Sequence, residues 1–380
     1  MKRIYLDNAA TTPVSPSVVQ AMSNTLTHVF GNPSSIHAEG RKARSVIEDA
    51  RKTVAGYIGA SIGEVFFTSC GTESNNMVLK GAVRDLGVER IISSPIEHHC
   101  VLHSLDAIGK EAPVERLNLG IGLNGRIDLG ELEDLLKNST KKTLVSLMHS
   151  NNEIGTMIDL EAVGALCATY GALFHTDTVQ TIGYFPINVE AAGVHFLSGS
   201  AHKFYGPKGV GFVYINNNNQ LKPFIDGGSQ ERNMRGGTEN IAGIVGLATA
   251  MDEAYSDLTS RREKVEMLRS YFKEKLESHF EEVQFNGEDG GISHYKVLSV
   301  SFPPSPKNDL LLLNLDIAGI SASGGSACSS GVDIGSHVLT AMGVDPERAT
   351  IRFSFSHHNT TAEIDFTMEQ LVKILSPVEV

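Results

Sequence analysis

A lysine lies in a loop of the kind that α/β proteins use to bind ligands. Residues 200–209 read Ser-Ala-His-Lys-Phe-Tyr-Gly-Pro-Lys-Gly and follow residues 194–198, an apolar run of strand length. Loops at the carboxyl ends of strands carry ligand-binding groups. Partial burial lowers the pKa of a lysine and frees its amine for Schiff-base chemistry. Lys203 is therefore a candidate nucleophile, although a lone lysine is more often an ordinary solvated charge.

An aspartate follows another predicted strand. Residues 172–175 form a short apolar run, and Thr176-Asp177-Thr178-Val179-Gln180 comes directly after it. A pyridine cofactor needs a carboxylate to keep its ring nitrogen protonated and a lysine to hold its aldehyde. Asp177 and Lys203 suit those two roles on neighbouring strands. Taken alone, an aspartate at a strand end is more often a helix cap.

A third group of residues is suited to binding phosphate. Thr68-Ser69-Cys70-Gly71-Thr72-Glu73-Ser74-Asn75-Asn76 lies between the predicted strand at 64–68 and a predicted helix. Small residues at such a turn leave backbone N–H groups free for an anion, and the helix dipole assists them. Helix capping alone would also explain these residue types.

Histidine and cysteine are densest in residues 96–103, which read Ile-Glu-His-His-Cys-Val-Leu-His. One interpretation is a metal site, because His99 and His103 would share a helical face and Cys100 is near. The other gives His98 a stacking and proton-transfer role beside a flat cofactor ring. We favour the second, because no further ligand group with zinc spacing is apparent.

Two more residues are candidates near the C-terminus. Cys328 lies in residues 321–331, a run so rich in Gly and Ser that we expect no regular element there. An accessible cysteine of that kind can act as a thiolate nucleophile. Arg352 lies on the polar side of a predicted strand at 350–356. It either clamps a substrate carboxylate through two hydrogen bonds or faces water.

The elements that must position these residues alternate along the chain. Helical periodicity, with Ser15 as an N-cap, alternates with apolar runs at 64–68, 143–148, 172–175, 194–198 and 210–215. This pattern predicts an α/β protein with a parallel sheet. After about residue 258, alternating strands at 296–302 and 350–356 and two amphipathic helices, one opened by a Thr360-x-x-Glu363 capping box, predict a smaller α+β domain.

Composition excludes several classes of protein. The 380 residues carry a formal net charge of −12, which opposes general binding to nucleic acid or to an anionic membrane. The four cysteines form no C-x-x-C pair, which argues against a disulfide framework and favours a reducing compartment. Asp7 and Asn8 interrupt any signal-peptide core, and no apolar run has membrane-spanning length. We expect a cytoplasmic protein.

Taken together, the motifs resemble those of the cysteine desulfurases of the NifS/IscS type, within the class V branch of fold-type-I pyridoxal phosphate enzymes. The resemblance covers nearly the whole chain. The motifs that carry it are residues 5–13 (Tyr-Leu-Asp-Asn-Ala-Ala-Thr-Thr-Pro), 30–33 (Phe-Gly-Asn-Pro), 72–75 (Thr-Glu-Ser-Asn), 149–155 (His-Ser-Asn-Asn-Glu-Ile-Gly), Asp177-x-x-Gln180, His202-Lys203, 205–209 (Tyr-Gly-Pro-Lys-Gly), 235–238 (Arg-Gly-Gly-Thr) and 325–328 (Gly-Ser-Ala-Cys).

The resemblance implies a role for each matching residue. Lys203 would hold pyridoxal 5'-phosphate covalently, Asp177 would pair with its ring nitrogen, and His98 would stack on the ring and take part in proton transfer. Gln180 and Asn152 would contact the ring oxygen region. The phosphate would be bound by Gly71, Thr72, Ser200 and His202, with Thr238 reaching in from the second subunit of a homodimer. Arg352 and Asn152 would bind the carboxylate of L-cysteine, and Cys328 would accept the sulfur.

The resemblance also implies an architecture and partners. It predicts a large domain with a mainly parallel seven-stranded sheet at 16–257, and a small domain made of 1–15 and 258–380 that carries the Cys328 loop. The sulfur would pass from Cys328 to an acceptor protein, either an iron–sulfur scaffold or a thiolation relay. Alternatives are a class V aminotransferase, a selenocysteine lyase or, from another class, a non-catalytic metal-binding module. We expect no bound metal.

Overall fold

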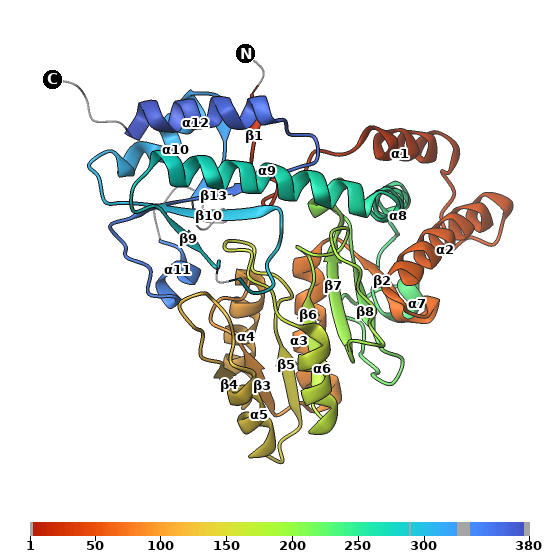
Figure 1. Ribbon diagram of the computed structural model, residues 1–380. Coiled ribbons are helices and arrows are strands. Elements are labelled where there is room, and N and C mark those ends of the chain that lie inside the picture. Colours follow the sequence, from red (N-terminus) through yellow and green to blue (C-terminus); the bar gives the residue numbers. More distant parts are fainter. Residues whose placement is uncertain (1–2, 289, 325–334, 376–380) are drawn as a thin grey trace.

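The largest element of the protein is a seven-stranded sheet. The structure, a computed structural model, describes residues 3–288, 290–324 and 335–375. The order of strands across the sheet is β2 (Val65–Thr68), β8 (Gly211–Ile215), β7 (Phe196–Ser200), β6 (Leu173–Asp177), β5 (Thr143–Ser146), β3 (Arg90–Ser93) and β4 (Glu115–Asn118) (Figure 1). Only β8 runs against its two neighbours, and every other pair in the sheet is parallel. The predicted α/β fold with a mainly parallel seven-stranded sheet is confirmed.

Helices bury both faces of this sheet. A strand points successive side chains to opposite faces, so Val65 and Phe67 belong to one apolar cluster and Phe66 to another. The first cluster includes residues of α2 (Ala38–Ile58), α5 (Leu129–Lys137), α6 (Leu160–Thr169) and α8 (Ile241–Ser256), and the second includes residues of α3 (Gly71–Leu86) and α4 (His99–Glu111). Burial on both faces explains why these strands are continuous apolar runs.

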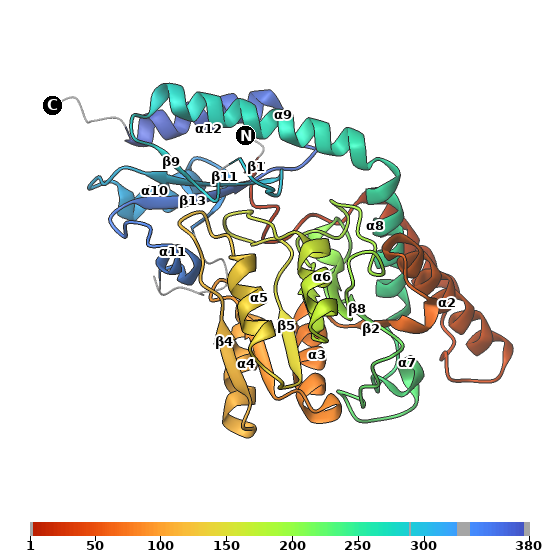
Figure 2. The ribbon, with the colours of Figure 1, turned by 60° about the horizontal axis from the view of Figure 1, so that its bottom comes forward.

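A smaller antiparallel sheet holds the C-terminal part of the chain. Its order is β12 (Ser323–Gly324), β13 (Ala349–Ser354), β10 (Val297–Phe302) and β9 (Gln284–Asn286). The helices α9 (Leu258–His279) and α12 (Thr361–Leu375) lie along it, and Figure 2 shows α9 continuing from α8 and crossing over the sheet. The remaining short helices of this part are α10 (Leu311–Ile317) and α11 (His337–Ala341).

The N-terminal residues join this C-terminal part. Strand β1 (Ile4–Tyr5) pairs in parallel with β11 (Ile320–Ser321). The prediction that residues 321–331 form no regular element is wrong for its first residues. Ser321 pairs with β1, and Ser323 pairs with Arg352 of β13, so hydrogen bonding to partners distant in sequence outweighs the local composition. Residues 325–331 lie outside the described residues.

Two of the helix starts that the sequence predicts have the expected capping hydrogen bonds. Helix α1 (Pro16–His28) starts after Ser15, whose Oγ accepts a hydrogen bond from the Val18 amide. At α12 the Thr360 hydroxyl accepts from the Glu363 amide, and the Glu363 carboxylate accepts from the Thr360 amide at 3.0 Å. These two contacts are the predicted capping box.

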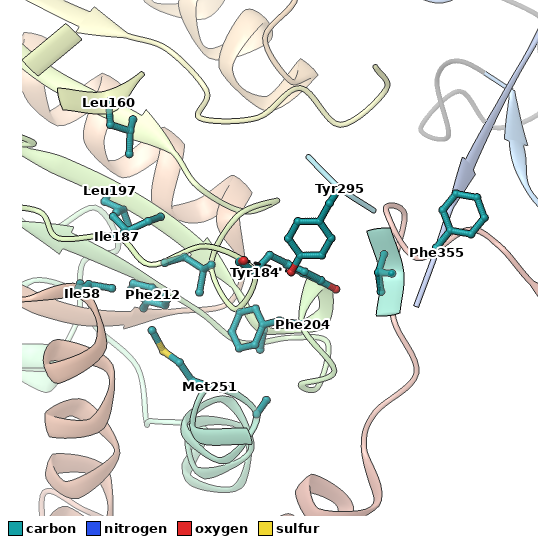
Figure 3. Packing of buried hydrophobic residues seen from close by; sticks show 14 of the residues in the cluster. Ile58, Leu160, Tyr184, Ile187, Leu197, Phe204, Phe212, Met251, Tyr295 and Phe355 are labelled. Carbon is teal, nitrogen blue, oxygen red and sulfur yellow. Dashed lines mark hydrogen bonds between the residues drawn. The ribbon is translucent and has the colours of Figure 1, made fainter. Parts of the chain in front are cut away.

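One continuous apolar cluster connects the two sheets. Figure 3 shows Tyr184, Phe204 and Tyr295 lying between Leu197 and Phe212 of the large sheet and Phe355, which follows β13. The Tyr184 hydroxyl donates to the backbone oxygen of Lys203 at 2.8 Å. A residue of the core therefore fixes the backbone of the candidate lysine.

Candidate active site

The candidate residues of the large sheet meet at the carboxyl ends of its parallel strands. Asp177 is the last residue of β6, and Ser200 is the last residue of the neighbouring β7. A short 3-10 helix, η2 (Ala201–Lys203), follows Ser200 directly and carries Lys203. The sequence predicted this placement from strand-like runs alone.

The amine of Lys203 is held against the N-terminal segment. Its Nζ donates to the backbone oxygens of Ala9 at 2.7 Å and Ala10 at 2.9 Å. The side-chain amide of Gln180 donates to the same Ala9 oxygen at 3.0 Å. The motif at residues 5–13 thus forms one wall of the site. Because these residues lie far from Lys203 in the sequence, the sequence alone does not show this contact.

The carboxylate of Asp177 is oriented by two donors. Its Oδ1 accepts from the Val179 amide at 2.9 Å, and its Oδ2 accepts from the Asn75 side-chain amide at 2.6 Å. The side chain is buried. A carboxylate that two N–H donors hold in one orientation is suited to pairing with a protonated ring nitrogen.

His98 is the N-cap of α4, and its imidazole has a defined tautomer. The Cys100 amide donates to its Nδ1 at 3.1 Å, so Nδ1 carries no proton and the neutral ring is protonated on Nε2. Burial lowers the pKa of His98, and the nearby Lys203 amine acts in the same direction, whereas the Asp177 carboxylate opposes them. The ring is therefore neutral near pH 7 and within electrostatic reach of both Asp177 and Lys203.

The predicted phosphate turn opens α3. A Cβ on Gly71 would lie 2.5 Å from Val179 Cγ2, so a side chain at this position would force Val179 to move. Thr72 is exposed, whereas His202 lies with its Nδ1 3.1 Å from the Thr11 hydroxyl. Burial and the nearby Lys203 lower the pKa of His202 to about 4, so its ring is neutral.

Two buried polar atoms in this region are available to bind a ligand. The Ser200 hydroxyl and the Gln180 side-chain oxygen have no hydrogen-bond partner among the described residues, although both side chains are at least 95% buried. Leaving such atoms unpaired costs about 1–3 kcal/mol each. The residues present therefore fit a polar group such as pyridoxal phosphate.

Arg352 is buried rather than exposed to water. Its Nη1 donates to the Asn152 backbone oxygen at 2.8 Å, and its Nη2 donates to Asp7 Oδ1 at 2.8 Å. Only 1% of the arginine is exposed, and its Nε has no hydrogen-bond partner among the described residues. The alternative that Arg352 faces water is wrong, because the N-terminal segment covers this side of β13. A substrate carboxylate is the kind of group that the spare N–H would bind.

Two predicted residues are not brought into this site. Thr238 lies on the exposed segment between α7 (Gln230–Asn233) and α8. Cys328 lies outside the described residues. The segment that contains it follows β12, whose Ser323 pairs with Arg352, so the chain enters that segment beside the proposed carboxylate site.

The histidine cluster does not form a metal centre in the part of the chain that the structure describes. The His99 ring stacks on His103 with centroids 5.2 Å apart and lies 4.4 Å from the His337 ring. Among the described residues, no group of three or more His, Cys, Asp or Glu side chains is placed to hold a metal ion.

The sequence reasoning missed several buried residues of the site. Asn75 and His175 lie behind Asp177, and Asp7 pairs with Arg352. The spacing His175-x-Asp177 places both side chains on the same face of the strand and could have indicated a role for His175. On a buried strand, however, this spacing does not distinguish a histidine that forms hydrogen bonds from one that only packs in the core. Asn75 belongs to the motif at 72–75, but its position in that motif does not point to Asp177.

Comparison with known proteins agrees with this geometry. Residues 4–366 match the family model described as aminotransferase class-V. The cysteine desulfurase IscS of Dictyoglomus turgidum is 43% identical, with 99% of this chain and 95% of that protein covered. A solved NifS-like protein superimposes with a TM-score of 0.90 at 37% identity, covering 98% of this chain and 99% of that one. A structure described as SspA in complex with cysteine has a TM-score of 0.80 at 31% identity, covering 94% of this chain and 100% of the other.

The chain belongs to the class-V aminotransferase family and, within it, to the cysteine desulfurases of the NifS/IscS type. Within the described residues, no helix is long and apolar enough to cross a membrane.

Proposed function

We propose that the protein is a pyridoxal phosphate-dependent cysteine desulfurase that converts L-cysteine to L-alanine and transfers the sulfur to Cys328 as a persulfide. The observation that carries this proposal is the arrangement at the ends of β6 and β7. A carboxylate held by two donors lies one strand away from a lysine, and the neutral ring of His98 lies within reach of both. The desulfurase relatives support the choice of substrate.

Each residue has a place relative to the cofactor. Lys203 would bind the aldehyde, Asp177 the ring nitrogen, and His98 would stack on the ring. The polar atoms of Gln180 and Asn152 would meet the ring oxygen region. The phosphate contacts would come from Gly71, Thr72, Ser200 and His202 at the start of α3 and the end of β7, and from Thr238 of a second subunit. When bound, pyridoxal phosphate supplies an electron-withdrawing ring and a carbonyl group that an amine can hold.

Side chains of the protein carry out the proton transfers. A base must take the proton from the substrate Cα, a proton must later reach Cβ, and Cα must regain a proton before alanine leaves. His98 has its Nδ1 occupied by the Cys100 amide and its proton on Nε2, so it is arranged to donate rather than to accept. Lys203 is therefore the proton acceptor, and Arg352 fixes the substrate by its carboxylate.

Cys328 supplies the nucleophile. Its thiolate attacks the sulfur of the substrate cysteine, forming an S–S bond as the C–S bond breaks. The electron pair of the C–S bond passes to the substrate carbon, which takes a proton and leaves as alanine. The persulfide on Cys328 is then passed to a thiol of a sulfur-acceptor protein, such as an iron–sulfur scaffold or a thiolation relay, in the cytoplasm.

The proposed assembly is a homodimer. Four exposed apolar side chains close in sequence, on α1 and in the loop before α2, support it: Val19 (51% exposed), Leu26 (70%), Phe30 (81%) and Ile36 (90%). Where exposed apolar side chains are contiguous, they mark protein–protein interaction sites. Thr238 is exposed, as a residue that reaches a partner's site would be. Within each subunit we propose a large domain at 16–257 and a small one at 1–15 and 258–380, which the pairing of β1 with β11 supports.

One assay separates this function from its rivals. Purified protein is given L-cysteine and dithiothreitol, and alanine and sulfide are measured; in parallel it is given a keto acid and tested for transfer of the amino group. We expect equal amounts of alanine and sulfide and no amino transfer. Amino transfer without sulfide would instead identify an aminotransferase, and a strong preference for selenocysteine would identify a selenocysteine lyase.

A further inference from the structure

Behind the Asp177 carboxylate lies a buried chain of hydrogen bonds. Asn75, His175 and Ser146 have no measurable exposure. The Asn75 amide nitrogen donates to Asp177 Oδ2 at 2.6 Å, its oxygen lies 3.1 Å from His175 Nε2, and His175 Nδ1 lies 2.8 Å from the Ser146 hydroxyl. These groups come from α3, β6 and β5, so three elements converge on one carboxylate.

The direction of each hydrogen bond in this chain is determined. Because the Asn75 nitrogen faces a carboxylate, its oxygen faces His175, and an amide oxygen only accepts. His175 Nε2 therefore carries the proton, and its Nδ1 accepts from the Ser146 hydroxyl. Burial lowers the pKa of His175 to about 3, so the ring keeps this neutral form at working pH. His175 Nε2 also lies 3.4 Å from the Ser198 hydroxyl, a longer contact that does not alter the assignment.

Asn75 also connects Asp177 to the other side of the site. Its amide nitrogen lies 3.2 Å from Cys100 Sγ, and that sulfur lies 2.9 Å from His98 Nδ1. The Cys100 sulfur thus lies beside the contact that the Cys100 amide makes with the same Nδ1. Burial raises the pKa of the Cys100 thiol to about 12, so the thiol stays protonated.

We propose that Asn75 is a positioning residue that holds the Asp177 carboxylate toward the cofactor ring and is itself oriented by His175. The inference rests on the proposed binding of pyridoxal phosphate beside Asp177. His175 fixes which end of the Asn75 amide faces the carboxylate. Without that donor, the amide could turn its oxygen toward Asp177, which would repel the carboxylate. The same amide also contacts the Cys100 sulfur, which lies against the His98 ring. Neither residue touches the reacting atoms.

The experiment compares matched pairs of variants. Asn75→Ala removes the donor to Asp177, whereas the control Asn138→Ala removes an exposed asparagine at the end of α5 whose side-chain amide donates to the Asp134 backbone oxygen at 2.8 Å. His175→Phe removes the donor to Asn75, whereas His175→Gln keeps an N–H at a similar position. The readouts are the dissociation constant of pyridoxal phosphate for the apoprotein, the pH dependence of the bound cofactor's visible spectrum, and thermal unfolding of the apoprotein.

The expected result for Asn75→Ala follows from the loss of one hydrogen bond to a charge, and His175→Phe acts by freeing the Asn75 amide to turn away from Asp177. Asn75→Ala and His175→Phe should weaken cofactor binding by roughly tenfold to a hundredfold and displace the pH transition of the spectrum. Asn138→Ala and His175→Gln should bind nearly as the wild type does.

Wild-type affinity and an unchanged spectrum in Asn75→Ala would overturn the inference. Equal weakening of cofactor binding in His175→Phe and His175→Gln would also overturn it, because it would mean that His175 acts only by packing. If Asn75→Ala does not fold, the two His175 variants decide the question. Failure of the wild-type protein to bind pyridoxal phosphate would instead contradict the proposed function.

Discussion

At the scale of single residues, Arg352 shows how partners distant in sequence define a binding group. Its guanidinium is held by Asp7 and by the Asn152 backbone oxygen, which leaves Nε for a ligand. Asp7 and Arg352 are separated by nearly the whole chain. The sequence could propose that Arg352 binds a carboxylate, but not that a carboxylate of the chain already orients it.

Replacing Arg352 with lysine tests this arrangement. Lysine keeps the charge but has no planar fork, so it cannot bond Asp7, Asn152 and a substrate carboxylate together. We expect Arg352→Lys to raise KM for cysteine by roughly tenfold to a hundredfold while the protein keeps its cofactor. Steady-state kinetics and the visible spectrum measure the two effects, and an unchanged KM would show that the substrate carboxylate binds elsewhere.

Glu153 gives the protein a pH dependence of stability. Burial raises the pKa of this carboxyl from 4.5 to about 7, against the lowering effect of the hydrogen bond from the Ser336 hydroxyl. The folded state therefore retains a proton that the unfolded chain loses above about pH 4.5. This group's contribution to stability is complete below that pH and is lost as pH rises through about 7.

Glu153→Gln should remove this dependence. Between about pH 4.5 and 7, the free energy of unfolding of the wild type should fall relative to the variant by up to about 3 kcal/mol. Chemical denaturation of both proteins at several pH values measures the difference. Parallel stability curves for the two proteins would show that Glu153 titrates normally in the folded state.

At the scale of elements, strands made of apolar runs were predictable, and strands with charged residues were not. The runs that became β2, β5, β6, β7 and β8 are apolar because helices cover both faces of the sheet. Strand β3 begins with the charged Arg90, and β4 is a half-exposed edge strand with the sequence Glu-Arg-Leu-Asn. Neither stands out from loop sequence. The reversed direction of β8 depends on its connections and is not encoded in the strand itself.

The α7 turn is an element that is held in place by one buried ion pair. Glu231, Arg232 and Asn233 all have positive φ angles, of 44°, 57° and 64°. Such backbone is unfavourable for residues with a side chain. The Glu231 carboxylate accepts from Arg51 Nη1 at 2.7 Å and Nη2 at 2.9 Å, and from the Phe67 amide at 2.7 Å. These contacts anchor the turn that leads to Thr238.

Arg51→Met should therefore be strongly destabilising. It leaves the Glu231 carboxylate buried without its charged partner, at a cost of about 3–5 kcal/mol. The control is Arg232→Met, which breaks a partly exposed ion pair with Glu48 worth at most about 1 kcal/mol. Urea unfolding of both variants measures the contrast. Equal stabilities would mean that the α7 turn does not depend on Arg51.

At the scale of the whole molecule, the proposed dimer accounts for the exposed apolar side chains of α1 and its loop. Replacing Phe30 and Ile36 together with aspartate places two charges in that surface. We expect the double variant to be monomeric by light scattering and to bind pyridoxal phosphate more weakly, because Thr238 would no longer reach a partner. The control is Leu123→Asp, at a side chain that is 86% exposed elsewhere. A double variant that remains dimeric would place the interface on another face.

The central claim is that Cys328 receives the sulfur of cysteine, and peptide mass spectrometry of the holoenzyme after exposure to cysteine tests it most directly. The protein is exposed to L-cysteine without reductant and then digested. The peptide that contains Cys328 is analysed beside the corresponding peptide of Cys328→Ala. We predict one added sulfur atom on Cys328 in the wild type. Cys328→Ala should keep the yellow cofactor but carry no added sulfur and release little alanine. Normal alanine release by Cys328→Ala, with no sulfur added to Cys328 in the wild type, would contradict the account.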